Sequence, residues 1–405
     1  MAVTYARGFR AGTAACGIKA FTTGASAIPR DQRDDLCVVH SAFPCDTGGV
    51  FTTNKVKSAS VVIDQLHLQR NRVQALTINS GNANACTGAQ GFRDALLMAK
   101  LSADRLDLDP DQVLVSSTGV IGRYLPMGAI KSGIAQACGN LSPDAGVAAA
   151  RAIMTTDTKP KTAHAELQIG GVTVRVGGMC KGSGMIHPNM ATMLAYITTD
   201  AAVEPGLMAR LAKPIADQSF NQVTIDGDSS TNDSFLVLAN GAAGNEPVRA
   251  DSEEQGRLRA AIEGVARQLS RKIARDGEGA TRLITVRVLE ATSVHDARTA
   301  ARAVASSSLV KTAVHGGDPN WGRIVCALGY SGAELALDRL HLSVGGLVVF
   351  ERGAGVDVDL AAVRRAFEEP EIEIVATLGL GEGKAEAWGC DLSEEYVRIN
   401  AEYTT

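Results

Sequence analysis

The chain has 405 residues, of which 45% are hydrophobic, and a formal net charge of −4. This length allows two or three lobes with a large core, and the small negative charge argues against nucleic acid or an anionic membrane surface as the main partner. No apolar run approaches the ~20 residues that a membrane-spanning helix needs. No apolar signal segment follows the arginines of the first ten residues, so we expect no secretory leader.

The eight cysteines show neither a CxxC pair nor zinc-type spacing to histidine. We therefore expect reduced thiols in a cytoplasmic protein, with most cysteines packed as small buried hydrophobic residues. Only 4% of the residues are aromatic and 42 are glycine, so we expect a core of Ala, Val, Leu and Ile between tight turns.

Short apolar runs alternate with stretches of helical periodicity along the chain. In the N-terminal half, strands are predicted at 37–40, 49–51, 61–63, 73–78, 113–115, 167–169 and 172–176, and helices at 92–106, 126–138 and 144–153. In the C-terminal half, strands are predicted at 193–198, 235–238, 283–289, 344–350 and 371–376, helices at 204–217, 257–275 and 295–312, and a tight turn at 318–323.

This order of elements indicates an α/β or α+β protein in which mixed sheets are layered between helices. The chain contains no internal repeat of solenoid period and no low-complexity linker. We therefore expect the parts before and after residue 191 to pack into one body, which would hold together if the chain were cut there.

Two polar loops follow predicted strands. The loop NSGNANACTG (79–88) is rich in residues that favour turns, and it is read either as a plain connection to a helix or as the polar wall of a small-molecule pocket. In SSTGVIG (116–122), Gly119 lets the backbone come close to a ligand and Thr118 adds a hydroxyl donor, which suits an anion or an oxyanion. A helix N-cap is the simpler function of that loop, and both readings are compatible.

Phosphate loops and a serine triad fit the sequence poorly. A P-loop ending at Lys384 would need glycine at position 378, which is leucine, and Ser or Thr at position 385, which is alanine. A GxGxxG motif at 182–187 fails at its last position, His187, and no GxSxG elbow is present. We interpret His187 as a packing or turn residue and not as a base.

The stretch 181–199, KGSGMIHPNMATMLAYITT, contains a different kind of nucleophile. Its Gly- and Pro-containing loop leads to Ala191 and Thr192, which stand before an apolar run. If the 191–192 bond is cut, Thr192 gains an α-amine with an ordinary pKa near 7.7–8.0, and that amine can act as base for its own hydroxyl. The Thr192 hydroxyl can make the cut itself by an N→O acyl shift. The plainer interpretation is a Gly-rich turn into a buried strand.

The segment KGSGMIHPNMATML (181–194) resembles the processing site of the arginine-biosynthesis ornithine acetyltransferase family, the glutamate N-acetyltransferases that make their own α and β chains. The resemblance covers essentially the whole chain in the family's order. It also includes GIKA (17–20), NSGNANACTG (79–88), SSTGVIG (116–122), IMTTDT (153–158), DGDSSTND (226–233), GEGATR (277–282), LVKTAVHGGDPNWGR (309–323) and NAEYTT (400–405).

This resemblance implies an α/β/β/α-like sandwich made of an α chain, residues 1–191, and a β chain, residues 192–405, in an α2β2 assembly. It implies that Thr192 is the nucleophile and that Thr118 and Gly119 form the oxyanion hole. The substrate-binding residues that it implies are Thr155, Lys181, Thr192, Glu278, Asn400 and Thr405.

The implied reaction is ping-pong transfer of an acetyl group from N2-acetylornithine to glutamate, with no metal or organic cofactor. Whether acetyl-CoA is a second donor stays open. One rival is an N-terminal-nucleophile aminopeptidase or amidase of similar fold, in which water takes the acyl group. Another is a non-catalytic, nucleotide-sensing or scaffold protein with Gly-rich loops, which would stay uncut and would keep its function when Thr192 becomes Ala.

Overall fold

The computed structural model describes residues 2–19, 34–70, 72–187 and 193–402, and within them two sheets. The larger sheet has the strand order β4-β3-β2-β8-β7-β6-β5, with β1 added on β2. Its strands are β1 (Phe9–Ala14), β2 (Leu36–Phe51), β3 (Val73–Asn82), β4 (Val113–Val120), β5 (Lys161–Ile169), β6 (Val172–Lys181), β7 (Leu194–Thr199) and β8 (Ser234–Ala239).

The long strand β2 divides this sheet into two leaves. Its first part pairs with β1 and β3, and after a register shift between His40 and Cys45 its last part pairs with β8. One core cluster takes Val39 and Leu76 from the first leaf and Met179 and Tyr196 from the second. The two leaves therefore pack face to face, and the alternate side chains of each strand fill the space between them.

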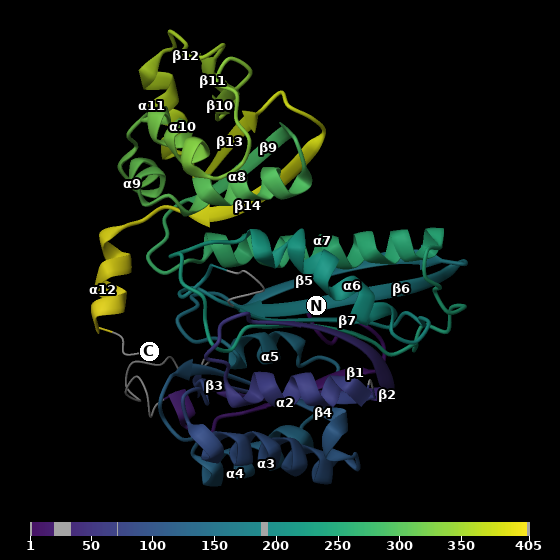
Figure 1. Cartoon of the computed structure of the whole chain (residues 1–405). Coiled ribbons are helices and arrows are strands. Elements are labelled where there is room, and N and C mark those ends of the chain that lie inside the picture. Colours follow the sequence, from purple (N-terminus) through teal and green to yellow (C-terminus); the bar gives the residue numbers. More distant parts are fainter. Residues whose placement is uncertain (1, 20–33, 71, 188–192, 403–405) are drawn as a thin grey trace.

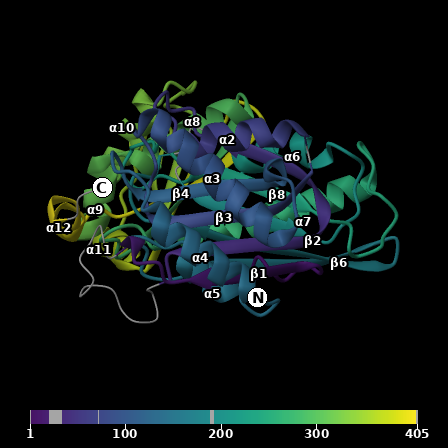
Figure 2. The ribbon, with the colours of Figure 1, turned by 90° about the horizontal axis from the view of Figure 1, so that it is seen from below.

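Helices cover the outer faces of both leaves (Figures 1 and 2). One cluster joins the first leaf to α2, α3 and α4, and another joins the second leaf to α6 and α7, so the predicted α/β/β/α sandwich is confirmed. The helices of the sandwich are α2 (Ala59–His67), α3 (Gly88–Leu106), α4 (Met127–Gly139), α5 (Gly146–Ala152), α6 (Leu207–Asp217) and α7 (Glu253–Arg275). No described helix is long and apolar enough to cross a membrane.

A second lobe stands beyond α7 in Figure 1 and has a core of its own. Its sheet has the order β12-β11-β10-β13-β9-β14. Its elements are β9 (Leu283–Ala291), α8 (Val294–Ser306), α9 (Ser308–Gly316), α10 (Trp321–Tyr330), β10 (His341–Val344), β11 (Leu347–Glu351), β12 (Ala354–Gly355), α11 (Leu360–Glu368), β13 (Glu371–Thr377) and β14 (Gly383–Cys390). The last described helix, α12 (Glu394–Glu402), leaves this lobe and runs back beside the sandwich.

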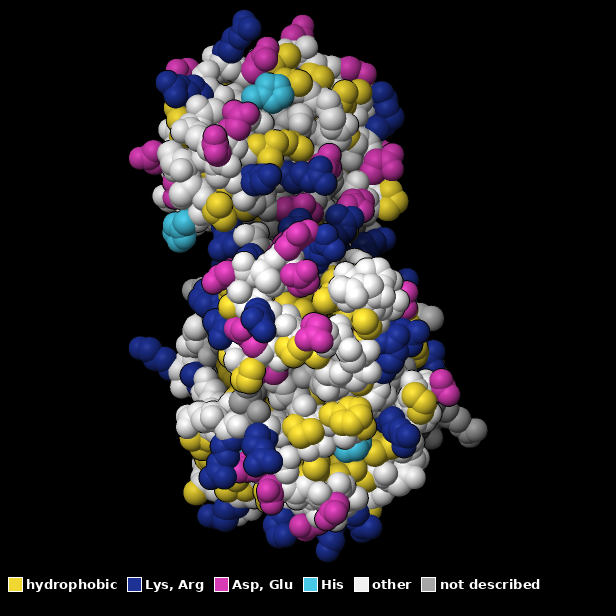
Figure 3. Space-filling view, turned by 90° about the vertical axis from the view of Figure 1, so that its right-hand side faces the viewer, with side chains coloured by type: hydrophobic (Ala, Val, Ile, Leu, Met, Phe, Trp, Pro, Cys, Tyr) yellow, Lys and Arg dark blue, Asp and Glu magenta, His cyan; other side chains and the backbone are white. Residues whose placement is uncertain are grey.

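The contact between the lobe and the sandwich is narrow. Basic and acidic side chains gather around this waist in Figure 3. Between the lobe and α7, Arg267 pairs with Glu386 at 3.0 Å and Arg271 pairs with Glu371. These arginines are more than a third exposed, so such pairs contribute little each. Trp388 of β14, by contrast, is fully buried in the core cluster of the sandwich. Burial of apolar area by this side chain is the stronger tie between the two parts.

The predicted division into residues 1–191 and 192–405 does not coincide with the two lobes. The sandwich is built from both sides of that boundary, because β6 pairs with β7 in antiparallel register and Lys181 stands opposite Leu194. Two chains made by a cut at 191–192 would therefore share one sheet. The division itself stays a prediction.

Most predicted elements are confirmed, and the errors have local causes. Residues 61–63 are helical and not a strand, because Ser58 caps α2 by accepting from the Val61 amide. The predicted strand at 344–350 is a hairpin, with Gly345 and Gly346 at φ values of 57° and 79°. The helix predicted at 295–312 breaks at Ser307, which caps α9, and the tight turn at 318–323 runs directly into α10.

Candidate active site

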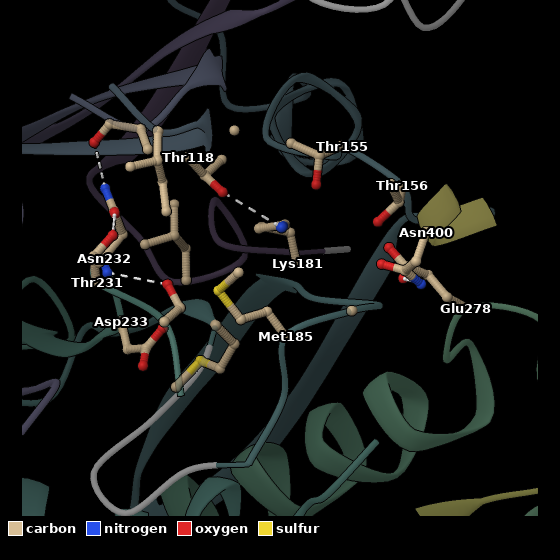
Figure 4. A pocket seen from close by; sticks show the side chains of 17 residues that line it. Thr118, Thr155, Thr156, Lys181, Met185, Thr231, Asn232, Asp233, Glu278 and Asn400 are labelled. Atoms are coloured by element: carbon tan, nitrogen blue, oxygen red, sulfur yellow. Dashed lines mark hydrogen bonds between the residues drawn. The ribbon is translucent and has the colours of Figure 1, made fainter. Parts of the chain in front are cut away.

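A pocket opens where β4 and β6 end and β7 and β8 begin, close to the sandwich face that α12 reaches (Figure 4). It is open to solvent and encloses about 750 Å³ of empty space, a volume that includes part of the solvent at its mouth. The lining residues are Ala83, Thr118, Gly119, Ile121, Thr155, Thr156, Lys181, Gly184, Met185, Met193, Leu194, Ser230, Thr231, Asn232, Asp233, Glu278 and Asn400.

The pocket gathers every predicted site residue that the structure describes. Those residues are Thr118, Gly119, Thr155, Lys181, Glu278 and Asn400. The remaining predicted residues, Ala191, Thr192 and Thr405, lie outside the described part of the chain. Met193, the residue after the proposed nucleophile, lines the pocket. The structure thus brings together side chains that are up to 282 positions apart in the sequence, from Thr118 to Asn400.

The two glycines of the polar loops lie side by side. Gly81 of β3 stands opposite Gly119 of β4, and a Cβ placed on Gly119 would lie 2.2 Å from the Gly81 carbonyl carbon. Gly119 also has a φ of 130°, which L side chains rarely adopt. Glycine is therefore required at 119, and it lets the two loops meet behind the Thr118 side chain.

The asparagines of the loop 79–88 do not form a polar pocket wall. Asn79 donates to the Asn82 carbonyl at 2.9 Å, and Asn84 donates to the Gly91 carbonyl at 2.9 Å. Only Ala83 of this loop lines the pocket among the described residues. The wall interpretation is thus wrong, and the loop acts as a self-bonded connection, because buried amide groups must find partners.

Lys181 is a buried cation on which the charges of Asp157, Glu278 and Asp233 act without direct contact. It is 8% exposed and forms no ion pair within the described residues; its ammonium donates to the Thr118 hydroxyl over 3.4 Å (Figure 4). Burial lowers the pKa of Lys181. Since the Thr118 oxygen accepts from Lys181, its own hydroxyl proton is free to point at a ligand. A ligand anion in the pocket would supply the charge that Lys181 lacks.

Asp157 fixes the backbone around Lys181 and was missed by the sequence analysis. This buried carboxylate accepts from the Gly182 amide at 2.7 Å, from the Thr155 amide at 3.1 Å and from the Lys161 ammonium at 2.6 Å. Burial opposes the ionised form, but the charges of Lys161 and Lys181 outweigh it and hold the pKa of Asp157 below its usual range. Its only sequence signal was its place in the block IMTTDT.

The other side of the pocket carries a negative charge. Glu278 is 7% exposed, and Asn400 of α12 donates to its carboxylate at 2.9 Å. Its backbone amide donates to the Ser183 carbonyl, and a Cβ on Gly184 would lie 2.3 Å from the Glu278 carboxylate. Gly184 thus makes room for this carboxylate. Figure 4 places Glu278 and Asn400 together, on the far side of Lys181 from Asn232.

Asn232 ties three loops together and was also missed. Its side-chain amide donates to the Ala83 carbonyl at 2.6 Å and to the Ser117 carbonyl at 2.8 Å. It therefore holds the loop before β8 against the ends of β3 and β4. The block DGDSSTND (226–233) contains it, but nothing in that block distinguishes Asn232 from its polar neighbours before folding.

An α/β/β/α sandwich with a buried lysine, a buried carboxylate and threonine hydroxyls around one pocket defines an enzyme for small charged molecules. Comparison with known proteins identifies its family. The model of the ArgJ family matches residues 11–405. The chain belongs to the ArgJ family.

Relatives named "Arginine biosynthesis bifunctional protein ArgJ" match along nearly their whole length. The protein from Symbiobacterium thermophilum is 50% identical over 403 residues, which cover 100% of this chain and 98% of the relative. The protein from Thermotoga neapolitana is 48% identical and covers 92% of this chain and 96% of its own length. A crystal structure of the protein of this name from Bacillus halodurans is 38% identical with a TM-score of 0.50, and it covers 51% of this chain and 98% of that chain.

Proposed function

We propose that this enzyme transfers the acetyl group of N2-acetylornithine to glutamate through an acetyl ester on Thr192. One observation carries the proposal. Those residues implied by the family resemblance that the structure describes, although far apart in sequence, line a single pocket together with Met193, the neighbour of Thr192. The names of the curated relatives, which refer to arginine biosynthesis and to two functions, support the same reaction.

The nucleophile arises by self-cleavage. The Thr192 hydroxyl attacks the Ala191 carbonyl, the peptide C–N bond breaks, and the nitrogen takes the proton to become a free amine. Water then opens the ester, which restores the hydroxyl and leaves a carboxylate on Ala191. The solved Bacillus halodurans chain supports this step, because 98% of it matches only 51% of this chain. Residues 192–405 make up slightly more than half of the sequence.

The charges of the pocket suit the donor. Lys181, buried and without a counter-ion within the described residues, binds the α-carboxylate. Glu278, oriented by Asn400, faces the distant ammonium of the ornithine part. This assignment places the acetylated nitrogen between the two charges, where Thr118 and the Gly119 backbone can stabilise an oxyanion; loss of one such donor typically costs ~10²–10³ in rate.

The reaction then proceeds in two balanced halves. The Thr192 hydroxyl attacks the acetyl carbonyl while its own amine takes the proton, the amide C–N bond breaks, and the amine passes the proton to the departing ornithine nitrogen. In the second half, the glutamate amine attacks the ester and leaves as N-acetylglutamate. The Thr192 oxygen recovers the proton, and the enzyme returns to its starting state.

A single-turnover experiment tests this scheme. Acetylornithine without glutamate should release a burst of ornithine equal to the enzyme concentration and leave a chain that starts at Thr192 heavier by one acetyl group, as measured by intact mass. Thr192→Ala should stay uncut and inactive. Steady release of ornithine without glutamate would identify water as the acceptor and favour the amidase alternative. No burst would overturn the ester intermediate.

Two finer points belong to the same proposal. We propose acetyl-CoA as a second donor, on the strength of the word "bifunctional" in the names of the relatives, and a wild-type assay with acetyl-CoA and glutamate alone tests it. We also propose an α2β2 assembly, which light scattering on the cleaved protein tests by its mass, twice that of the 42.2 kDa chain.

A further inference from the structure

The backbone that enters the proposed cut is held by the loop 224–229. The Asp226 carboxylate accepts from two consecutive amides, Met185 at 2.5 Å and Ile186 at 2.8 Å. The Ile225 amide donates to the Ile186 carbonyl at 2.7 Å. Met185 has a φ of 54°, a left-handed conformation that is strained for a residue with a side chain. Asp226 therefore holds a sharp turn just before the cut.

His187 extends this contact to the second lobe. The Ser229 hydroxyl donates to the His187 carbonyl at 2.9 Å. On its ring, Nδ1 lies 2.9 Å from the Thr224 hydroxyl and Nε2 lies 2.9 Å from the Arg302 guanidinium. A guanidinium only donates, so Nε2 accepts and Nδ1 carries the ring proton. His187 is therefore neutral and has no free lone pair, in agreement with its interpretation as a turn residue and not a base.

Arg302 comes from α8 and is half-buried. It forms no ion pair with a carboxylate of the described residues, and its Nε atom is buried without a partner there. Burial lowers the pKa of Arg302, while burial and the nearby Arg302 charge lower the pKa of His187 to about 4. Partial burial of an arginine whose hydrogen-bond partner is a neutral histidine costs the fold free energy. This cost points to a role beyond stability.

The chain is held on the far side of the cut as well. The Ser234 amide donates to the Met193 carbonyl at 2.9 Å, and Leu194 pairs with both Lys181 and Ser234 in the sheet. His187 and Met193, the described residues on either side of 188–192, are thus both held by the sandwich. Fixed ends reduce the freedom that the 191–192 bond must lose before the Thr192 hydroxyl can attack it.

We propose that Asp226, His187 and Arg302 are positioning residues for self-cleavage, and that the cut waits until the second lobe has docked on the sandwich. This inference rests on the proposed function. Asp226 holds the turn, and His187 passes the contact to Arg302, which arrives only with α8. Cleavage thus depends on a lobe whose core contributes nothing to the pocket lining.

Cleavage kinetics test this inference. Precursor synthesised in a short pulse should convert to two chains on a denaturing gel, and Asp226→Asn and Arg302→Met should each slow that conversion by about tenfold or more, the effect of losing a hydrogen bond to a charged group. Arg302→Lys should recover much of the rate, because lysine can still donate to Nε2. Arg298→Met is the matched control: Arg298 lies one turn earlier on α8 and bonds no part of His187, so its rate should stay that of wild type.

A double mutant separates positioning from general support of the fold. If Arg302 acts through His187, Arg302→Met should slow cleavage no further in a His187→Phe background. The same variants in a Thr192→Ala background, which cannot cut, measure the effect on melting temperature alone, and the slowing of cleavage by Asp226→Asn and Arg302→Met should not follow the order of those changes. If Asp226→Asn and Arg302→Met cleave at the rate of a wild type that itself cleaves, this inference is overturned and the proposed function stays intact. A wild type that never cuts would overturn both.

Discussion

Two buried lysines on neighbouring strands differ in whether a carboxylate pairs with them. Lys161 of β5 is 2% exposed and bonds two carboxylates, Asp157 at 2.6 Å and Asp276 at 2.5 Å. Lys181 of β6 is 8% exposed and has no carboxylate partner in the described chain. The first charge is neutralised inside the fold and stabilises it, whereas the second forms no ion pair with a described residue. A lysine in a core is thus identified as structural or functional only by its partners.

The largest expected effect is on stability at Lys161. Lys161→Met leaves the buried Asp157 and the half-buried Asp276 without their ion-pair partner, and breaking a buried pair in this way typically costs about 3–5 kcal/mol. Urea unfolding of the Thr192→Ala form measures the loss without interference from cleavage. Lys181→Met in the same background serves as the control and should lose much less stability than Lys161→Met, because Lys181 forms no ion pair within the described residues and its burial opposes its charge. Equal losses at the two positions would contradict the comparison.

The next effect is on activity at Lys181. Lys181→Met should lower kcat/KM for N2-acetylornithine by about 10²-fold, since a buried charge pair with the substrate carboxylate is lost. Most of this loss should be a rise in KM and not a fall in kcat. The Lys181→Met chain should still cleave itself, as seen on a denaturing gel. Lys181→Arg keeps the charge and should retain more activity than Lys181→Met. If Lys181→Arg and Lys181→Met lower kcat/KM for N2-acetylornithine equally, Lys181 does not act by its charge.

A smaller effect is expected at the negative side of the pocket. Gly184→Ala places a methyl group 2.3 Å from the Glu278 carboxylate, which must then turn away from Asn400. We expect about a tenfold rise in KM for acetylornithine, the cost of one charge-assisted hydrogen bond. KM for glutamate should change less, because glutamate lacks the distant ammonium. Steady-state assays with each substrate varied in turn measure both, and equal changes would show that Glu278 does not recognise the donor.

The smallest expected effect is on the pH dependence of the free energy of unfolding, which should differ in sign between the two lysines. Burial opposes the charge of Lys161, but Asp157 and Asp276 raise its pKa, so its stabilisation is complete below the unfolded value of ~10.4 and is lost as pH rises through the folded pKa. Burial lowers the pKa of Lys181, so its penalty is relieved as pH rises from the folded pKa toward ~10.4.

Unfolding in urea between about pH 8 and 11 measures these opposite slopes, each at most ~1.4 kcal/mol per pH unit. The difference between the Thr192→Ala parent and its Lys161→Met variant should shrink at the alkaline end. The difference between the parent and its Lys181→Met variant should grow in favour of the parent. Slopes of the same sign would contradict the assigned surroundings.

The wrong predictions came from short-range sequence patterns whose effect was outweighed by hydrogen bonds to other residues. The β-branched run at 61–63 favours a strand, but a capping bond from Ser58 fixes a helix. The asparagines of 79–88 looked like pocket residues because polar loops often are, yet their side chains donate to backbone carbonyls of the same loop, of the next helix and of the segment after β4. Polarity alone does not say whether a side chain will bond the protein or a ligand.

The pocket residues Thr118, Gly119, Thr155, Lys181, Glu278 and Asn400 were all accessible from sequence, because each lies in a short block of Gly, Thr, Asn or charged residues that resembles the family. Local composition also determined the layered α/β class. The supports of those residues were not accessible. Asp157 and Asn232 hold backbone groups on other strands, and His187 meets Arg302 across 115 positions.

Tertiary packing alone decided which buried charges have partners. Lys161 and Lys181 have the same side chain and neighbouring strands, and their sequence contexts do not tell them apart. The difference is made by Asp276 at the end of α7, which reaches Lys161 across the fold. Ionisation and hydrogen bonding depend on distances of a few ångströms between distant segments, because the interaction of buried charges falls off with separation and with access to water.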